Sequence, residues 1–178
     1  MKEQKIKTYN IMLSRVFPKT HPRAGEDTGF KPKVFASFNN MPCYLKKLHT
    51  IRANYPLWKE RFDEVQRGEA VINLRLWLGE PYRSKTVLIK TLTADDGIGI
   101  QKVRINTHHV CLKNEPEYFC SEVGIVDDVY EAMLVPSERL ANNDGLELQD
   151  WLDWFSDYDN TQPLAIIHFT PFRYTRKH

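Results

Sequence analysis

An alternating stretch followed by a tight turn is the feature that most limits how this chain can fold. Residues 71–77 alternate between apolar and polar or amphipathic side chains, the turn residues Gly79, Glu80 and Pro81 follow, and a second strand pattern occupies residues 84–92. Alternation with a period of two indicates a strand with one buried face, and a short turn between two such strands indicates a β-hairpin. The chain therefore needs a sheet, with a core on one side of this hairpin.

Other strand signals are shorter and are distributed along the chain. We expect strands at residues 9–17, 101–106, 109–113 and 164–169, separated by turn residues. Residues 19–46 show only a short apolar run at 34–38, so we expect an irregular insertion there.

Two segments have helical periodicity. Asn54 can cap a helix that has Pro56 in its first turn, places Trp58 and Phe62 on one face, and ends near Gly68. A second apolar stripe predicts a helix at residues 147–155. Together these elements predict an α+β fold with an antiparallel, partly closed sheet and two or three flanking helices.

Composition limits the class of protein. A chain of 178 residues with 42% hydrophobic residues can bury one core and is short for two, so we expect one domain over residues 1–178. No stretch is apolar enough for a membrane span or an export signal, which predicts no membrane partner and a cytoplasmic location. The three cysteines, Cys43, Cys111 and Cys120, fit reduced thiols. His108 and His109 near them match no common zinc spacing, so we expect no metal and no cofactor.

The small net charge of +2 conceals an asymmetry. Residues 1–90 hold 18 Lys and Arg against 8 Asp and Glu, whereas residues 91–178 hold 7 against 15. A basic face from the first half would suit a phosphate-bearing partner. The alternative is that the two halves neutralise each other within one fold.

Residues 47–52, with the sequence KLHTIR, resemble the K-x-x-T-x-R signature of ASCH domains, which are relatives of the PUA fold. Further segments are similar to a subgroup met in phages and in Bacteroidetes-type genomes. These segments are residues 17–26, 75–85, 143–146 and 151–155. The resemblance implies a PUA-like β-barrel whose signature residues project over a cleft, and it implies binding of RNA or a modified nucleoside.

One branch of this family resembles an amidohydrolase that deacetylates N4-acetylcytidine with a Lys, a Thr and a Glu. The matching positions here are Lys47, Thr50 and Asp144, so the carboxylate is one methylene shorter than in those enzymes. Independently of the family, a desolvated Lys47 beside Arg52 would have a lowered pKa and could act as a base, with Thr50 as a nucleophile or hydrogen-bond donor. The alternative is that Lys47 and Arg52 are solvated charges and Thr50 is an ordinary strand residue.

The hairpin offers a second set of candidate ligand contacts. If its apolar positions face the core, Arg75 and Trp77 face outward together, close in sequence to further basic and aromatic residues. Basic and aromatic side chains side by side can stack a base and hold a phosphate. The predicted binding residues are Lys47, Thr50, Arg52, Arg75, Trp77, Tyr82, Arg83 and Lys85. The alternative for Trp77 is that it fills a gap beneath the helix.

Three functions remain open from the sequence. The first is a module that binds RNA or a modified nucleoside, and the second is a metal-independent nucleoside amidohydrolase. The third is a protein-interaction module of a phage or mobile element. An enzyme requires Lys47, Thr50 and Asp144 to converge on one small pocket, whereas an RNA-binding module requires a groove that extends beyond it.

Overall fold

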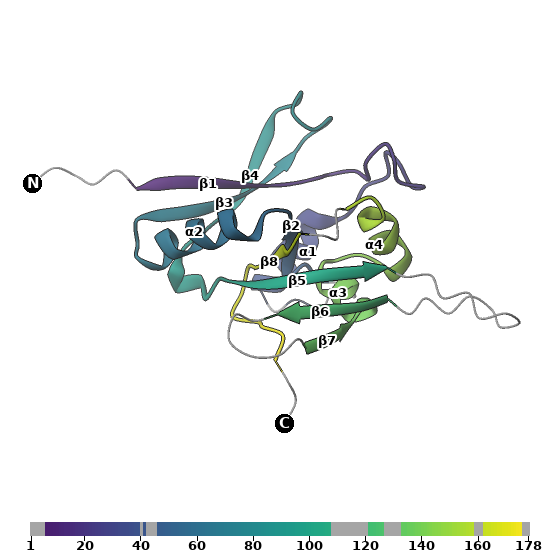
Figure 1. The fold of residues 1–178 in the computed structure, drawn as a ribbon. Coiled ribbons are helices and arrows are strands. Elements are labelled where there is room, and N and C mark those ends of the chain that lie inside the picture. The colour runs from purple at the N-terminus through teal and green to yellow at the C-terminus, as the bar shows by residue number, and fades with distance from the viewer. Residues whose placement is uncertain are drawn as a thin grey trace, which may run out of the picture.

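The computed structural model describes residues 6–39, 41, 46–107, 121–126, 133–158 and 162–175. Within these residues the chain forms two sheets and four α-helices. The smaller sheet has the order β1-β3-β4, and the larger has the order β2-β8-β5-β6-β7 (Figure 1). The α+β class is therefore confirmed, but the described strands fall into two sheets rather than one. Barrel closure and kinship with the PUA fold stay predictions.

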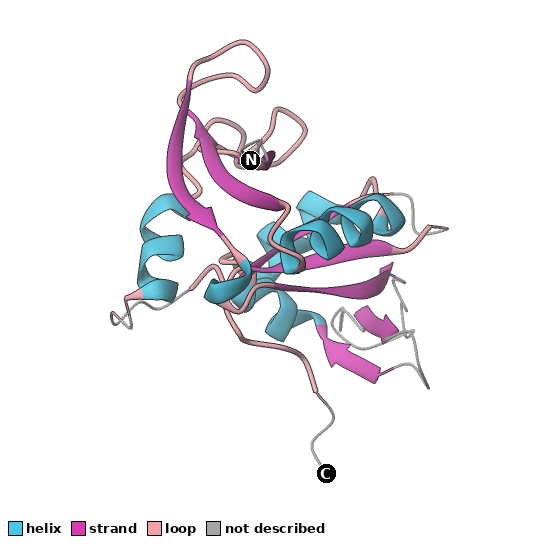
Figure 2. Ribbon diagram, turned by 90° about the vertical axis from the view of Figure 1, so that its left-hand side faces the viewer, coloured by secondary structure: helices cyan, strands magenta, loops and turns pink. Residues whose placement is uncertain are grey.

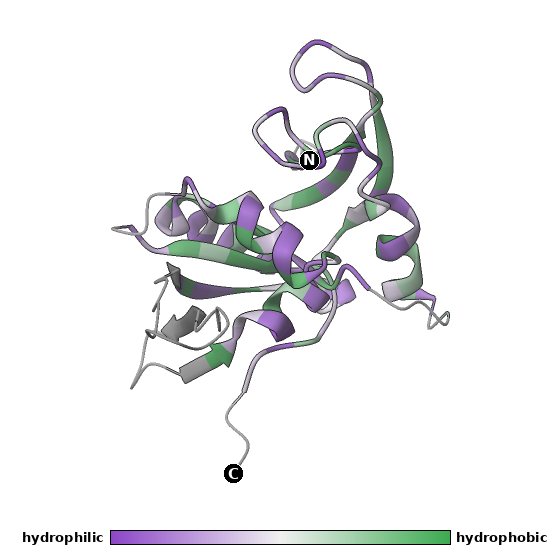
Figure 3. Cartoon of the chain, turned by 90° about the vertical axis from the view of Figure 1, so that its right-hand side faces the viewer, coloured by the Kyte–Doolittle hydropathy of each residue, from purple (hydrophilic) through white to green (hydrophobic). Residues whose placement is uncertain are grey.

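The predicted hairpin is confirmed as β3 (Ala70–Trp77) and β4 (Thr86–Leu92), which pair antiparallel. Alternate residues of β3, from Ala70 to Leu76, are buried, and those between them are half-buried, as the alternation predicted. The hairpin projects away from the rest of the molecule (Figure 2). Figure 3 shows that the loop at its tip is largely hydrophilic, whereas hydrophobic stretches lie along the strands below.

The third strand of the small sheet contradicts the antiparallel expectation. β1 (Lys7–Leu13) pairs with β3 in parallel, with Lys7 opposite Ala70 and Leu13 opposite Leu76. A parallel pair requires a long crossover connection, and here two helices and a strand supply it. β1 also ends before the predicted strand does, because Val16 pairs instead with Asp27 in an isolated bridge.

The segment expected to be irregular contains helix α1 (Phe30–Phe38). Its start carries no side-chain cap, and Gly29 precedes it with a φ of 66°. Because this signal is missing, the local sequence does not predict α1. Burial of Phe30 and Val34 in the core stabilises the helix instead.

Helix α2 (Tyr55–Gln66) confirms the strongest helix prediction, including the cap, because the Asn54 side chain accepts a hydrogen bond from the Leu57 amide. Its buried face contacts β3 of the small sheet and both β5 and β8 of the large sheet. In Figure 1, α2 accordingly lies between the two sheets. This helix therefore fixes how the sheets are placed relative to each other.

The large sheet is built around β8 (Leu164–His168), all five residues of which are buried between β2 (His49–Arg52) and β5 (Gly99–Thr107). β6 (Ser121–Val126) and β7 (Met133–Pro136) extend it in antiparallel order. The predicted strands at 101–106 and 164–169 correspond to β5 and β8. The predicted strand at 109–113 lies outside the described residues.

Two short helices close the end of this sheet. α3 (Ser137–Asn143) was not predicted, and it contacts β6, β7 and α4. α4 (Leu148–Phe155) confirms the predicted second helix and buries Trp151, Leu152 and Phe155. With α1 and α3, the described part of the chain has more helices than the two or three expected.

Candidate functional site

A pocket of about 390 Å³ lies where β1, β2, α2, the hairpin and the α3–α4 connection meet. Lys47, Thr50 and Arg52 of the signature line it together with Asp144. Trp77 and Tyr82 of the hairpin line it as well. The structure thus brings six of the nine predicted site residues to one cavity, from segments far apart in the sequence.

The centre of the pocket is a buried ion pair. The Lys47 ammonium donates hydrogen bonds to the Asp144 carboxylate at 2.5 Å and to the Asp144 carbonyl oxygen at 2.7 Å. Lys47 is 1% exposed and Asp144 is 3% exposed, so neither charge is compensated by bulk water. The ring of Phe30 lies 3.9 Å from the Lys47 nitrogen and adds a cation–π contact. The shorter Asp side chain therefore does reach the amine.

The C-terminal end of α3 places Asp144 beside Lys47. Asp144 is the C-cap residue of α3 and forms an isolated bridge with Lys47, and Gly145 follows with a φ of 78°. A Cβ on Gly145 would lie 3.2 Å from the Lys47 Cβ and 3.3 Å from the Lys33 Cδ. Glycine is needed here both for the left-handed conformation and for the close approach of Lys47.

The electrostatic environment shifts the pKa values of both groups of this pair. Burial lowers the pKa of Lys47 to about 8, aided by the nearby charges of Arg52 and Lys33 and opposed by Asp144. Burial also raises the pKa of Asp144, while Lys47 and Arg52 oppose that shift. Both shifts bring the pKa of the Lys47 amine and the pKa of the Asp144 carboxyl closer together.

Lys47, Thr50 and Arg52 line the same pocket, although Lys47 lies just before β2 in an isolated bridge with Asp144. Thr50 and Arg52 are two residues apart on β2 and both line the pocket. Lys47 precedes the strand, and the Leu48 amide donates to the Asn143 carbonyl at 2.8 Å. Within the described part of the chain, the Thr50 hydroxyl has no hydrogen-bond partner and so remains available to a ligand.

Two hydrogen bonds to backbone carbonyls hold the Arg52 side chain in place. Its guanidinium donates to the Met12 carbonyl at 2.6 Å and to the Ile51 carbonyl at 2.9 Å. Burial lowers its pKa from the usual value, and Tyr158, Asp144 and Tyr82 oppose that shift. The backbone contacts hold the cation at the pocket wall, where it can meet a phosphate or a carbonyl.

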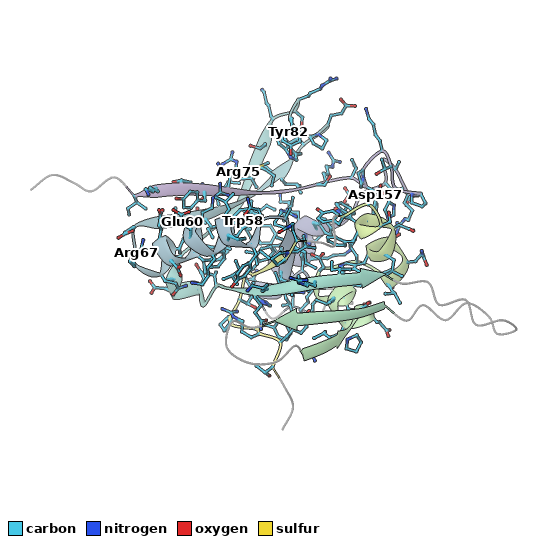
Figure 4. All side chains as sticks on the ribbon, in the orientation of Figure 1. Trp58, Glu60, Arg67, Arg75, Tyr82 and Asp157 are labelled. Atoms are coloured by element: carbon cyan, nitrogen blue, oxygen red, sulfur yellow. The ribbon has the colours of Figure 1, made fainter. Side chains whose placement is uncertain are left out.

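Two hairpin aromatics form the outer rim. The rings of Trp77 and Tyr82 lie 5.5 Å apart with an interplanar angle of 52°. Tyr82 is 91% exposed and has a φ of 64°, which is strained for a residue with a Cβ. Figure 4 shows Tyr82 on the projecting hairpin, with Arg75 nearer its base and Trp58 on α2.

The other predicted hairpin residues lie outside this pocket. The Arg75 guanidinium donates to the Thr86 hydroxyl at 3.0 Å, which links the two hairpin strands, and Lys85 is exposed. Arg83 lines a second hollow of about 540 Å³ together with Lys19, Phe17 and the turn 79–81. This hollow shares Ser14 and Pro81 with the first pocket, so the two lie next to each other.

Several residues of the site were not predicted. Trp58, Trp154 and Tyr158 add aromatic walls to the pocket. His49, inside the KLHTIR segment, contacts the Tyr174 hydroxyl at 2.7 Å. No local signal connects these residues, since His49 and Tyr174 are 125 positions apart. His168 on β8 is buried, and among the described residues neither of its ring nitrogens has a hydrogen-bond partner.

The metal prediction can be examined only in part. No cluster of three or more metal-ligating side chains occurs among the residues that the structure describes. His108, His109, Cys111 and Cys120 lie outside those residues, as does Cys43.

Comparisons with known proteins found no relative of this chain. No protein-family model matches the sequence, and neither the curated proteins nor the solved structures include a significant match. In the described part of the chain, no helix is both long and apolar enough to cross a membrane.

Proposed function

We propose that the pocket around Lys47 binds one nucleobase, presented either by an RNA chain or as a modified nucleoside. The observation that carries this proposal is the convergence of Lys47, Thr50, Arg52 and Asp144 with Trp77 and Tyr82 on one cavity of about 390 Å³. That volume lies in the range of small-molecule sites. Polar groups at the base can read the edge of a ring, and the aromatic rim can stack on its face. An ASCH-like, PUA-type identity is part of the same proposal.

The second hollow favours a nucleotide chain over a free nucleoside. It lies beside the pocket, with Ser14 and Pro81 lining both, and Arg83 and Lys19 line its outer part. A neighbouring nucleotide could lie over the apolar Phe17–Pro18 wall while its phosphate meets these cations. Glu80 lies 2.9 Å from Lys19 and 3.9 Å from Arg83, so part of their charge is already compensated.

Salt dependence tests this proposal. Binding of a short single-stranded RNA should weaken steeply as salt rises, because each neutralised phosphate releases counterions. Arg52→Ala should weaken binding at every salt concentration, whereas Arg104→Ala, at an exposed position on β5 that lines neither hollow, should not. Fluorescence anisotropy measures both effects. Binding that ignores salt, or an Arg52→Ala variant that binds as well as the parent, would rule out an RNA ligand.

Trp77 provides a separate prediction. If it stacks on a base, its fluorescence should be quenched on binding, and Trp77→Ala should weaken binding by about 1–3 kcal/mol. Trp77→Phe, which keeps a smaller ring, should lose less. A sharp fall in the melting temperature of Trp77→Ala with binding intact would instead identify Trp77 as a core residue.

A second candidate function is a metal-independent amidohydrolase, and one observation favours it. A buried amine with a pKa of about 8 contacts a carboxylate, and a hydroxyl without a partner among the described residues lines the same pocket. These are the groups needed to activate a nucleophile and to protonate a leaving amine. The third possibility, an interaction module, would use exposed apolar side chains, and of these Leu78, Tyr82 and Leu88 lie together on the β3–β4 hairpin.

A further inference from the structure

A chain of buried polar groups continues from the ion pair into the interior, away from the pocket. The Asn143 amide nitrogen donates to the Tyr174 hydroxyl oxygen at 2.9 Å, and that hydroxyl lies 2.7 Å from His49 Nε2. On the other side of the ring, His49 Nδ1 lies 4.0 Å from the Asp144 carboxylate that holds Lys47. His49 is fully buried and Tyr174 is 2% exposed.

The hydrogen bonds specify the form of the His49 ring. The Tyr174 oxygen already accepts a hydrogen bond from the Asn143 amide, and its own hydroxyl proton, buried away from water, needs an acceptor. His49 Nε2 is within reach and can accept it only if that nitrogen carries no proton. A neutral imidazole then carries its proton on Nδ1, the nitrogen that has no hydrogen-bond partner within the described part of the chain.

Burial, aided by neighbouring groups, keeps the His49 ring neutral. Burial lowers the pKa of His49 well below its usual value, and the neighbouring His168 and Lys47 lower it further. The Nδ1–H dipole therefore faces Asp144 without adding a full charge. At 4.0 Å the contact is too long for a direct hydrogen bond, but it favours the ionised carboxylate electrostatically.

We propose that His49, held in its Nδ1–H form by Tyr174, is a positioning residue that orients the Asp144 carboxylate and thereby tunes the Lys47 amine. This inference deepens the proposed function, since it assigns control of the ion pair at the base of the same pocket. It places the controlling groups on β2 and on the C-terminal segment after β8, on the far side of Asp144 from the ligand.

The consequence for Lys47 has a definite sign. Removing the Nδ1–H donor makes the ionised Asp144 carboxylate less favourable, so Asp144 offers less negative charge to the ammonium. The pKa of Lys47 should then fall below its value of about 8. The other charged or titratable groups near these three residues are Lys33, Arg52, Arg139, Tyr158, His168 and Arg173.

The first measurement is the ring form itself. Long-range ¹H–¹⁵N correlation spectra of the labelled full chain at pH 7 should show a protonated Nδ1 and an unprotonated Nε2 for His49. Tyr174→Phe keeps the aromatic ring and removes the hydroxyl, so His49 should become a mixture of both forms. A parent protein with the proton on Nε2 would overturn the proposal.

The second measurement follows Lys47. Because Lys47 is 1% exposed, its pKa is best read without a reagent, from the pH dependence of its ¹³Cε chemical shift in protein labelled with ¹³C-lysine. His49→Leu should lower this pKa by about half a unit or more. His49→Asn, which can place an amide N–H near the Nδ1 position, should recover most of the difference. Tyr174→Phe should shift the value part of the way.

These outcomes separate the inference from a purely structural role and from the proposed function. A core residue that only fills space would change the melting temperature but leave the Lys47 pKa the same in all four proteins, which would overturn the inference. Neither measurement uses RNA or a nucleoside. A protein that binds no nucleic acid but shows the expected shifts would therefore refute the ligand assignment and support the role of His49. If His49→Leu does not fold, Tyr174→Phe still decides the outcome.

Discussion

Replacing Lys47 by Met is expected to lower the free energy of unfolding at pH 7 by about 3–5 kcal/mol, because the Asp144 carboxylate would be left buried and unpaired. The two side chains are 2% and 4% exposed, and their charged atoms lie 2.5 Å apart. Removing one partner of such a pair costs far more than the pair itself contributes. Urea denaturation followed by circular dichroism measures the change.

Two comparisons make this prediction specific. The double variant Lys47→Met with Asp144→Asn removes both charges and should recover most of the loss. Lys59→Met removes the cation of the exposed Lys59–Asp63 pair and should cost less than about 1 kcal/mol, since that pair is 43% and 47% exposed. Equal effects of Lys47→Met and Lys59→Met would mean that the Lys47 pair is not buried in solution.

The same pair should produce a pH dependence of stability. The pKa of Lys47 is about 8 in the folded protein against 10.5 for the free side chain, so between these values the unfolded chain binds the proton that the folded chain has released. Stability then rises with pH in this window, by up to about 1.4 kcal/mol per pH unit. The parent should therefore gain stability relative to Lys47→Met from pH 8 to pH 10.

The second large effect concerns catalysis. If the chain is an amidohydrolase, it should convert N4-acetylcytidine and water to cytidine and acetate without added metal, and Asp144→Asn should reduce the rate by about 10²–10⁴-fold. An amide cannot carry the proton to the leaving amine. Lys47→Ala should abolish turnover, and the parent rate should rise with pH through about 8 as Lys47 loses its proton. Chromatographic separation of cytidine from its acetylated form measures the rate.

Control variants sharpen the assay. Lys59 lies on α2 outside the pocket, so Lys59→Met should leave the rate unchanged. The sequence alone suggested that Asp144→Glu would restore a longer reach. The structure changes that expectation, because Asp144 already contacts Lys47 and is 3% exposed, so an added methylene must displace a packed neighbour. If micromolar protein leaves acylated cytidine, adenosine and guanosine untouched over hours, the hydrolase is rejected and Lys47 and Thr50 remain ligand contacts.

The local pattern of the sequence was sufficient for elements that carry their own signals. The alternation before Trp77 determined β3 and its buried face, and Asn54 with Pro56 determined the start of α2. In each case the information lies within a few residues, because backbone caps, turns and side-chain periodicity are short-range properties. The candidate site residues Lys47, Thr50, Arg52 and Asp144 came instead from the resemblance to ASCH domains, and Asp144 had no other signal, since its own segment predicts only a turn.

Only the tertiary structure decided how these pieces meet. The parallel pairing of β1 with β3, the uncapped helix α1 and the contact of Lys47 with Asp144 across 97 positions all depend on burial against distant segments. The link from His49 to Tyr174 is likewise invisible in the sequence. Desolvation shifts the pKa of Lys47, and desolvation is a property of the packed interior that surrounds a side chain. The sequence shows which residue types are present, but folding sets their burial, their contacts and therefore their pKa values.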